Sequence, residues 1–117
     1  MTHRIELGPR PEIDDPRGAA AARQARDYLG LPVDAIRTRS IYKLDMQLDR
    51  ATVDRVRRAM TDPVLEESAL DRLALPPCRW VVVVGFLPGV TDNLGHTARV
   101  VAEDVVGVGT AVERRAV

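Results

Sequence analysis

The feature that most constrains this chain is an internal repeat, in which residues 4–40 align without a gap on residues 81–117. The offset is 77 residues, which is the separation of Asp15 from Asp92. The nine identical pairs are Gly8/Gly85, Pro11/Pro88, Asp15/Asp92, Gly18/Gly95, Ala21/Ala98, Ala25/Ala102, Asp27/Asp104, Gly30/Gly107 and Arg37/Arg114. Repetition of this kind indicates one supersecondary unit used twice. We therefore expect the second part of the chain to repeat the fold of the first.

Helix caps recur at matching places in the two copies. Asp15 and Asp92 stand where the N-cap of a helix is expected, and Pro16 occupies the favoured first helical position. Gly30 and Gly107 stand where a C-cap glycine is expected. Each copy is therefore predicted to hold one helix between its capping aspartate and its glycine.

The rest of the repeated pattern predicts a strand before that helix and one apolar helix face. The strands are expected at Ile5–Leu7 and Val81–Val84. The helix faces are Gly18, Ala21, Ala25, Tyr28 and Leu29 in the first copy and Gly95, Ala98, Ala102, Val105 and Val106 in the second. Small residues at the start of each face are expected to let the helix lie close to a sheet.

The first copy continues into further elements. Residues 36–48 alternate in the manner of a long strand, and Asp49–Thr61 predicts a second helix with Val53, Val56 and Met60 inward. A third strand is expected around Leu65–Leu73. The predicted fold is α+β: a β-α-β-α-β unit with an antiparallel-type sheet and helices on one face, followed by a truncated second β-α-β copy.

The predicted domain limits follow from this pattern. The first unit is placed at residues 1–74, a proline-containing linker at 75–79, and an incomplete second unit at 80–117. Residue 117 falls inside the expected long strand of the second copy. Because a domain that ended there would expose an unpaired strand edge, we expect the chain to be a fragment of a longer protein.

Composition argues against several classes of protein. Lys+Arg and Asp+Glu both number 17, so no overall positive field draws the chain to nucleic acid or to an acidic membrane. Aromatic residues make up only 3%, too few for stacking platforms that bind single strands. The single cysteine, Cys78, excludes a disulfide within the chain and suits a cytoplasmic protein.

Candidate reactive residues lack the partners that chemistry needs. A nucleophilic Cys78 would need a histidine and a sharp strand-to-helix turn, but it follows Pro76 and Pro77 in the expected linker. His96 is interpreted as a solvated or capping residue. Glu66 and Glu67 are adjacent on a predicted strand and so point to opposite faces. No catalytic, cofactor-binding or metal-binding residue is predicted.

Three arginines remain as candidates for contact with another domain. Arg37 and Arg39 are two residues apart on a predicted strand and share a face, and Arg114 repeats the first of them. A solvated charged face and a contact patch for a neighbouring domain are both compatible with this pattern.

Four segments carry a resemblance to a known family. They are Asp15–Gly18, Ile36–Leu44, Asp62–Glu67 and Val84–Ala98, the last of which reads VGFLPGVTDNLGHTA. The first three resemble PurS proteins. The fourth is similar to the long fused form of phosphoribosylformylglycinamidine synthase, in which PurS-like units precede the synthetase domains.

The resemblance implies a function for the chain. The family's reaction converts formylglycinamide ribonucleotide, glutamine and ATP to formylglycinamidine ribonucleotide, glutamate, ADP and phosphate, a ligase step of purine biosynthesis. PurS-like regions are not the catalyst there, but bridge synthetase and glutaminase. The implied partners are therefore those domains or subunits, with PurS-like pairing between copies, and no nucleic acid or membrane. ATP and magnesium are implied for the complete enzyme, with no cofactor in this piece.

Two other functions stay open at this point. Repeated β-α-β units also suit a free-standing regulatory module that binds a small ligand, as ACT-like domains do. A separate PurS-type subunit, whose second copy serves only for dimerisation, is the other alternative.

Overall fold

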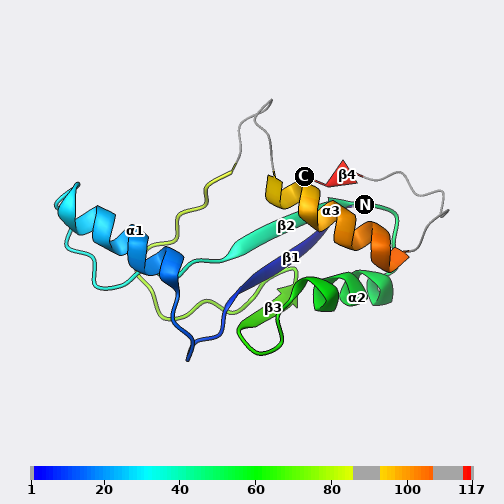
Figure 1. The fold of residues 1–117 in the computed structure, drawn as a ribbon, viewed down its shortest axis with the longest axis horizontal. Helices are drawn as coiled ribbons and strands as arrows, with labels where there is room; N and C mark the ends of the chain where they lie inside the picture. Colours follow the sequence, from blue (N-terminus) through cyan, green and yellow to red (C-terminus); the bar gives the residue numbers. More distant parts are fainter. Residues whose placement is uncertain (1, 86–92, 107–114, 117) are drawn as a thin grey trace.

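The computed structural model describes residues 2–85, 93–106 and 115–116, which form four strands and three helices (Figure 1). Their order along the chain is β1 (Thr2–Pro9), α1 (Pro16–Asp27), β2 (Ser40–Asp45), α2 (Arg50–Met60), β3 (Glu66–Leu70), α3 (Asn93–Val106) and β4 (Arg115–Ala116). No helix among these described residues is both long and apolar enough to cross a membrane.

The strands form one antiparallel sheet in the order β3-β1-β2-β4. The strand β1 is central: Leu7 lies opposite Ser40 of β2 on one side and Ser68 of β3 on the other. The short β4 pairs with the end of β2, where Ala116 lies opposite Leu44. The first repeat therefore supplies three neighbouring strands, and the second repeat adds the fourth at the β2 edge.

Two helices, α2 and α3, cover one face of this sheet (Figure 1). The buried cluster between helices and sheet consists of Ile5, Leu44, Met46, Val56 and Ala102, with Tyr42, Leu48, Met60, Leu70 and Val105 packed against it. The helical periodicity of α2 produces this contact, because its apolar positions recur every three or four residues on one side. The prediction of helices on one face of an antiparallel sheet is confirmed for α2 and α3.

The first helix, α1, lies beyond the end of the sheet (Figure 1). Its small-residue face, Gly18, Ala22 and Ala25, is buried against the loop that follows the helix. The prediction that this face lies against the sheet is wrong. Tyr28 and Leu29 were expected on the inward face but are 85% and 70% exposed.

The loop after α1 accounts for this difference. The backbone N–H of Leu31 donates to the carbonyl of Ala25 at 2.9 Å, and the Arg26 guanidinium donates to the carbonyls of Val33 and Asp34. These bonds fold residues 31–34 back along α1. The small face of the helix is therefore occupied by its own loop, and no sheet is needed to cover it.

Two predicted strands also differ. The strand β2 is Ser40–Asp45, shorter than the predicted 36–48, because the backbone N–H of Thr38 bonds to the side chain of Asp15. Val81–Val84, predicted as a strand, belongs to no strand in the structure. By contrast, Gly95, Ala98 and Ala102 of α3 are buried, as the repeated helix face predicts.

Gly18 is the position where α1 comes closest to other backbone. A Cβ atom built there would lie 2.0 Å from the carbonyl oxygen of Ile36. A real Cβ cannot approach a backbone atom so closely, so the loop would have to move away.

We predict that Gly18→Ala lowers the free energy of unfolding by about 1–3 kcal/mol, the usual cost of overpacking. Alanine in a helix would on its own add about 0.5–1 kcal/mol of stability, so the sign of the change identifies the close approach. Urea denaturation monitored by circular dichroism measures the difference. The control is Gln24→Ala, an exposed position on the same helix, which should change stability by less than about 0.5 kcal/mol. An unchanged or increased stability of Gly18→Ala would contradict the prediction.

Candidate functional site

The densest set of polar contacts around a predicted site residue is centred on Asp15, the N-cap of α1. Its carboxylate accepts hydrogen bonds from the backbone N–H of Gly18 at 2.9 Å and of Thr38 at 2.5 Å. The Thr38 hydroxyl donates to the same carboxylate at 2.8 Å. Asp15 is only 7% exposed. One side chain therefore caps a helix and fixes the entry to β2 at the same time.

The surroundings of Asp15 favour its charged form. Burial acts to raise the pKa of this carboxyl, but the hydrogen bonds from Gly18 and Thr38 and the positive charge of Arg37 outweigh burial and lower the pKa below its ordinary value. The carboxylate therefore stabilises the fold at neutral pH, where it is ionised.

Arg37 fastens the loop that precedes Asp15. Its guanidinium donates to the carbonyl oxygens of Ile13 at 2.8 Å, Arg10 at 2.9 Å and Pro9 at 3.3 Å. Residues 9–15 are thus tied to residues 37–38 by Arg37 on one side and by Asp15 on the other.

Arg39 contacts the segment after β3. Its guanidinium donates to the carbonyl of Leu73 at 2.9 Å and lies 3.9 Å from the carboxylate of Glu67, with only 18% of the side chain exposed. Both arginines that were candidates for contact with another domain therefore bind their own chain. Contact of either with a neighbouring domain stays a prediction.

The remaining predicted residues are placed as follows. Gly30, just beyond α1, has a φ of 64°, a left-handed conformation that suits glycine. Gly95 is buried in the first turn of α3. Asp92, Gly107 and Arg114 lie outside the described residues.

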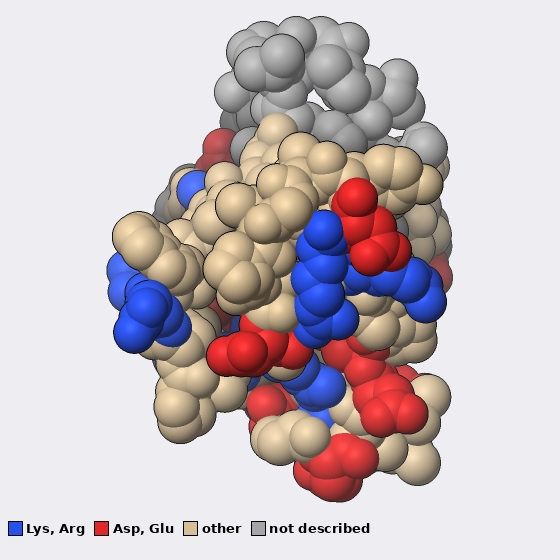
Figure 2. Space-filling view, turned by 90° about the vertical axis from the view of Figure 1, so that its left-hand side faces the viewer, with Lys and Arg blue, Asp and Glu red and all other residues tan. Residues whose placement is uncertain are grey.

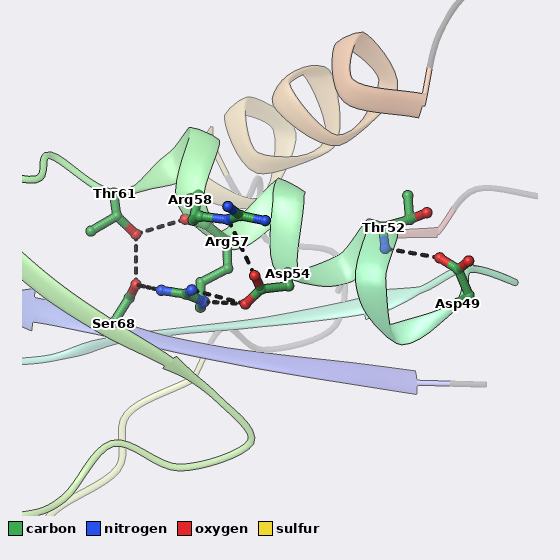
Figure 3. A network of polar contacts seen from close by, with 7 residues as sticks. All are labelled: Asp49, Thr52, Asp54, Arg57, Arg58, Thr61 and Ser68. Carbon is green, nitrogen blue, oxygen red and sulfur yellow. Dashed lines mark hydrogen bonds and ion pairs between the residues drawn. The ribbon is translucent and has the colours of Figure 1, made fainter.

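A second polar network joins α2 to β3 (Figure 3). The Asp54 carboxylate binds Arg57 at 2.8 Å and Arg58 at 3.1 Å, and Arg57 also donates to the hydroxyl of Ser68 at 3.0 Å. Thr61 completes the network, with its hydroxyl 2.7 Å from that of Ser68. Sequence reasoning missed this network, although the spacing of Asp54 from Arg57 and Arg58 is that of ion pairs on one helix face.

The chemical capacity of this network is limited. The Ser68 hydroxyl contacts an arginine and a second hydroxyl, not a base that could remove its proton. The hydrogen bond from Arg57 lowers the pKa of Asp54. Partial burial acts to raise this pKa, but the positive charges of nearby arginines lower it further. Asp54 therefore serves as an ionised partner for arginine, and the network holds the end of α2 on β3.

The other features that chemistry could use are sparse in the part of the chain that the structure describes. Within it no three His, Cys, Asp or Glu residues gather in a way that could hold a metal ion. Cys78 is an exposed free thiol, and His96 is exposed on α3. A shallow, open depression of about 410 Å³ is lined by Arg55, Arg58 and Val105.

We predict that Asp15→Asn destabilises the protein by about 1–3 kcal/mol at pH 7, because one buried acceptor is replaced by a donor facing N–H groups. Since the pKa of Asp15 is lowered in the folded state, the carboxylate's contribution is present above the ordinary pKa and is lost as pH falls through the folded value. The difference in the free energy of unfolding between the variant and the parent protein should therefore shrink below about pH 4. Urea denaturation over a pH series measures it.

The matched control is Asp14→Asn, at the exposed neighbouring position. It removes the same charge without removing the cap, so it should cost less than about 0.5 kcal/mol at pH 7. Equal effects of the two variants would show that net charge, not the hydrogen bonds of Asp15, accounts for the loss.

Comparison with known proteins gives similar structures but no similar sequences. No family model matches the chain, and neither does any curated protein. PurS of Methanocaldococcus jannaschii, one of the subunits of formylglycinamide ribonucleotide amidotransferase, superposes with a TM-score of 0.50 and 16% identity, over 60% of this chain and 92% of its own.

Two other solved structures superpose less closely. The purS subunit of phosphoribosylformylglycinamidine synthase from Thermotoga maritima has a TM-score of 0.44 and 24% identity, over 62% of this chain and 90% of its own. PurS of Thermus thermophilus has a TM-score of 0.45 and 22% identity, over 65% of this chain and 96% of its own. At such low sequence identities a structural similarity shows a shared fold and nothing more. The superposition on M. jannaschii PurS is the one that supports the shared fold. The chain therefore has a PurS-like fold.

Proposed function

We propose that this chain is a scaffold portion of phosphoribosylformylglycinamidine synthase that bridges the synthetase and the glutaminase. The observation that carries the proposal is the superposition on M. jannaschii PurS, itself a subunit of formylglycinamide ribonucleotide amidotransferase. The sequence segments that resemble the family, among them Asp15–Gly18 and Asp62–Glu67, supply independent support.

The environment of the polar residues agrees with a structural role. Asp15, Arg37 and Arg39 each hold parts of the chain together through hydrogen bonds to backbone groups. The network of Asp54, Arg57 and Ser68 has the same character. In the proposed function ATP, magnesium and the glutaminase chemistry belong to the other domains, and this chain positions them.

The turn between α2 and β3 is a candidate docking point. Val64 and Leu65 are 71% and 48% exposed there. The Arg10 guanidinium donates to the carbonyl of Pro63 in this turn, and the Asp62 carboxylate accepts from the backbone N–H groups of Val64 and Leu65. Exposed apolar side chains on a well-ordered turn are suited to contact with another protein, because little conformational freedom is lost on binding.

We predict that the chain co-purifies with the synthetase and glutaminase of the same genome and is required for glutamine-dependent formation of formylglycinamidine ribonucleotide. Activity with ammonia supplied in solution should depend on the chain much less, because a bridge between the two sites is then unnecessary. Affinity purification of the tagged chain followed by activity assays with glutamine and with ammonia measures both.

Val64→Asp tests the docking point, with Leu75→Asp as the control at another exposed apolar position. The first should weaken co-purification at least about tenfold, an effect of about 1.4 kcal/mol, and the second should not. The proposed function is refuted if the chain does not co-purify with the synthetase and the glutaminase and also has no effect on the glutamine-dependent activity.

A further inference from the structure

The depression lined by Arg55, Arg58 and Val105 lies where α2 and α3 meet. Its two arginines are three residues apart on α2, so they project from one face of that helix. Val105 belongs to α3 of the second repeat and packs against the buried cluster. Figure 3 shows Arg58 on the side of α2 that is nearer to α3. The depression therefore exists only because the helices of the two repeats pack together.

Positive charge is in excess at this depression. Residues 54–58 carry three arginines and one aspartate. Arg55 is exposed and forms no ion pair within the part of the chain that the structure describes. Arg58 binds the carboxylate of Asp54 at 3.1 Å, but Arg57 binds the same carboxylate at 2.8 Å, and the side chain of Arg58 stays 65% exposed. One aspartate therefore cannot neutralise the three arginines, and Arg55 is left without a partner there.

The neighbouring helix does not neutralise this charge. On α3, Arg99 pairs with Glu103 at 3.1 Å. Asp104, next to Val105, is exposed and forms no ion pair with either arginine of the depression in the described residues.

The end of the molecule that carries α1 has a different surface. Figure 2 shows acidic and basic side chains mixed on that face, beside a broad uncharged area. Arg37, which belongs to that end, binds backbone carbonyl groups of its own chain. Because the formal net charge of the whole chain is zero, the excess at α2 is a local property and not the result of a basic protein.

The shape and the lining of the depression select the class of ligand. Small molecules bind in concave pockets that bury most of their surface, whereas this depression is shallow and open. Single-stranded nucleic acid binds along a basic groove with stacking aromatic rings, and the described lining holds no such ring. Arginine is enriched in protein interfaces and binds a carboxylate through two parallel hydrogen bonds. Two arginines beside an apolar side chain therefore suit an acidic protein segment.

We propose that the depression between α2 and α3 docks an acidic segment of a partner protein. Arg55 and Arg58 each bind a carboxylate of that segment, and Val105 contacts an apolar side chain between the two carboxylates. Arg55 contributes most, because it gives up no partner of its own on binding, whereas Arg58 is shared with Asp54. The proposal rests on the charge and shape of this surface and does not depend on the proposed function.

Binding of a fluorescently labelled peptide to the full chain, followed by fluorescence anisotropy, tests the proposal. The peptide carries glutamates on both sides of a central leucine, and the control peptide has glutamine in place of each glutamate. We expect the acidic peptide to bind at least about tenfold more tightly than the control at low salt, and to weaken as salt screens the charges. Equal binding of the two peptides, or no binding of the acidic one, would overturn the proposal.

Charge reversal at Arg55 locates the binding site. Arg55→Glu removes no ion pair of the described structure, so the variant should fold, as circular dichroism can verify. It should weaken binding of the acidic peptide at least about tenfold, and Arg58→Gln should weaken it several-fold. The matched control is Arg23→Glu, which reverses the charge of an exposed arginine on α1 and should change the affinity by less than about twofold. Unchanged binding by Arg55→Glu, or equal losses from Arg55→Glu and Arg23→Glu, would overturn the proposal.

Inorganic phosphate, added as a competitor, separates a protein-docking surface from a site for small anions. We expect phosphate to displace the acidic peptide only at concentrations far above that of the peptide, where it acts as a screening salt. Displacement by phosphate at a concentration equal to that of the peptide would identify a site for small anions and overturn the proposal.

Discussion

The contact on which the rest of the fold depends is the joint packing of α2 and α3 on the β1–β2 pair. Ile5, Leu44, Val56 and Ala102, from four separate elements, are all fully buried there. Each large aliphatic side chain removed from water contributes about 1.5–3 kcal/mol, and the chain has few aromatic residues to supply the same area elsewhere. The small side chain of Ala102 lets α3 approach closely. Because Ala102 belongs to the second repeat, the first repeat has no complete core without it.

Polar contacts, by contrast, fix the position of α1. The helix lies outside the sheet, and the carboxylate of Asp15 and the guanidinium of Arg37 tie its start to the loop before β2. A buried carboxylate is tolerated at this point because it accepts hydrogen bonds from the backbone N–H groups of Gly18 and Thr38 and from the Thr38 hydroxyl. The same contacts explain why β2 begins at Ser40: the backbone N–H of Thr38 is directed at Asp15.

Features set by neighbouring residues were predictable from the sequence. The cap at Asp15 and the inward positions Val53 and Val56 depend on local backbone geometry and on helical periodicity, both visible in one segment. The exposure of Tyr28 was not predictable, because the outcome depends on which surface the helix meets. The contacts of Arg37 and Arg39 with distant carbonyl groups were not predictable either, because the sequence gives the charge of each arginine but not the group that it binds. The ion pairs of Asp54 with Arg57 and Arg58 could be predicted from their spacing on one helix. The further hydrogen bond from Arg57 to Ser68 could not, because it depends on how α2 packs on β3.

The two edges of the sheet differ in a way that bears on how the repeats join. The outer strand β3 carries Glu66 and Glu67, and charged residues at a sheet edge oppose pairing with further strands. On the opposite side of the sheet β2 pairs with the short β4, which is the edge strand there. Growth of the sheet is therefore directed to the side where the repeats meet. At that side α3 also joins the core of the first repeat, because Ala102 and Val105 pack with Ile5 and Leu44. Because this core is shared between the repeats, loss of α3 would expose Ile5 and Leu44 of the first repeat to water.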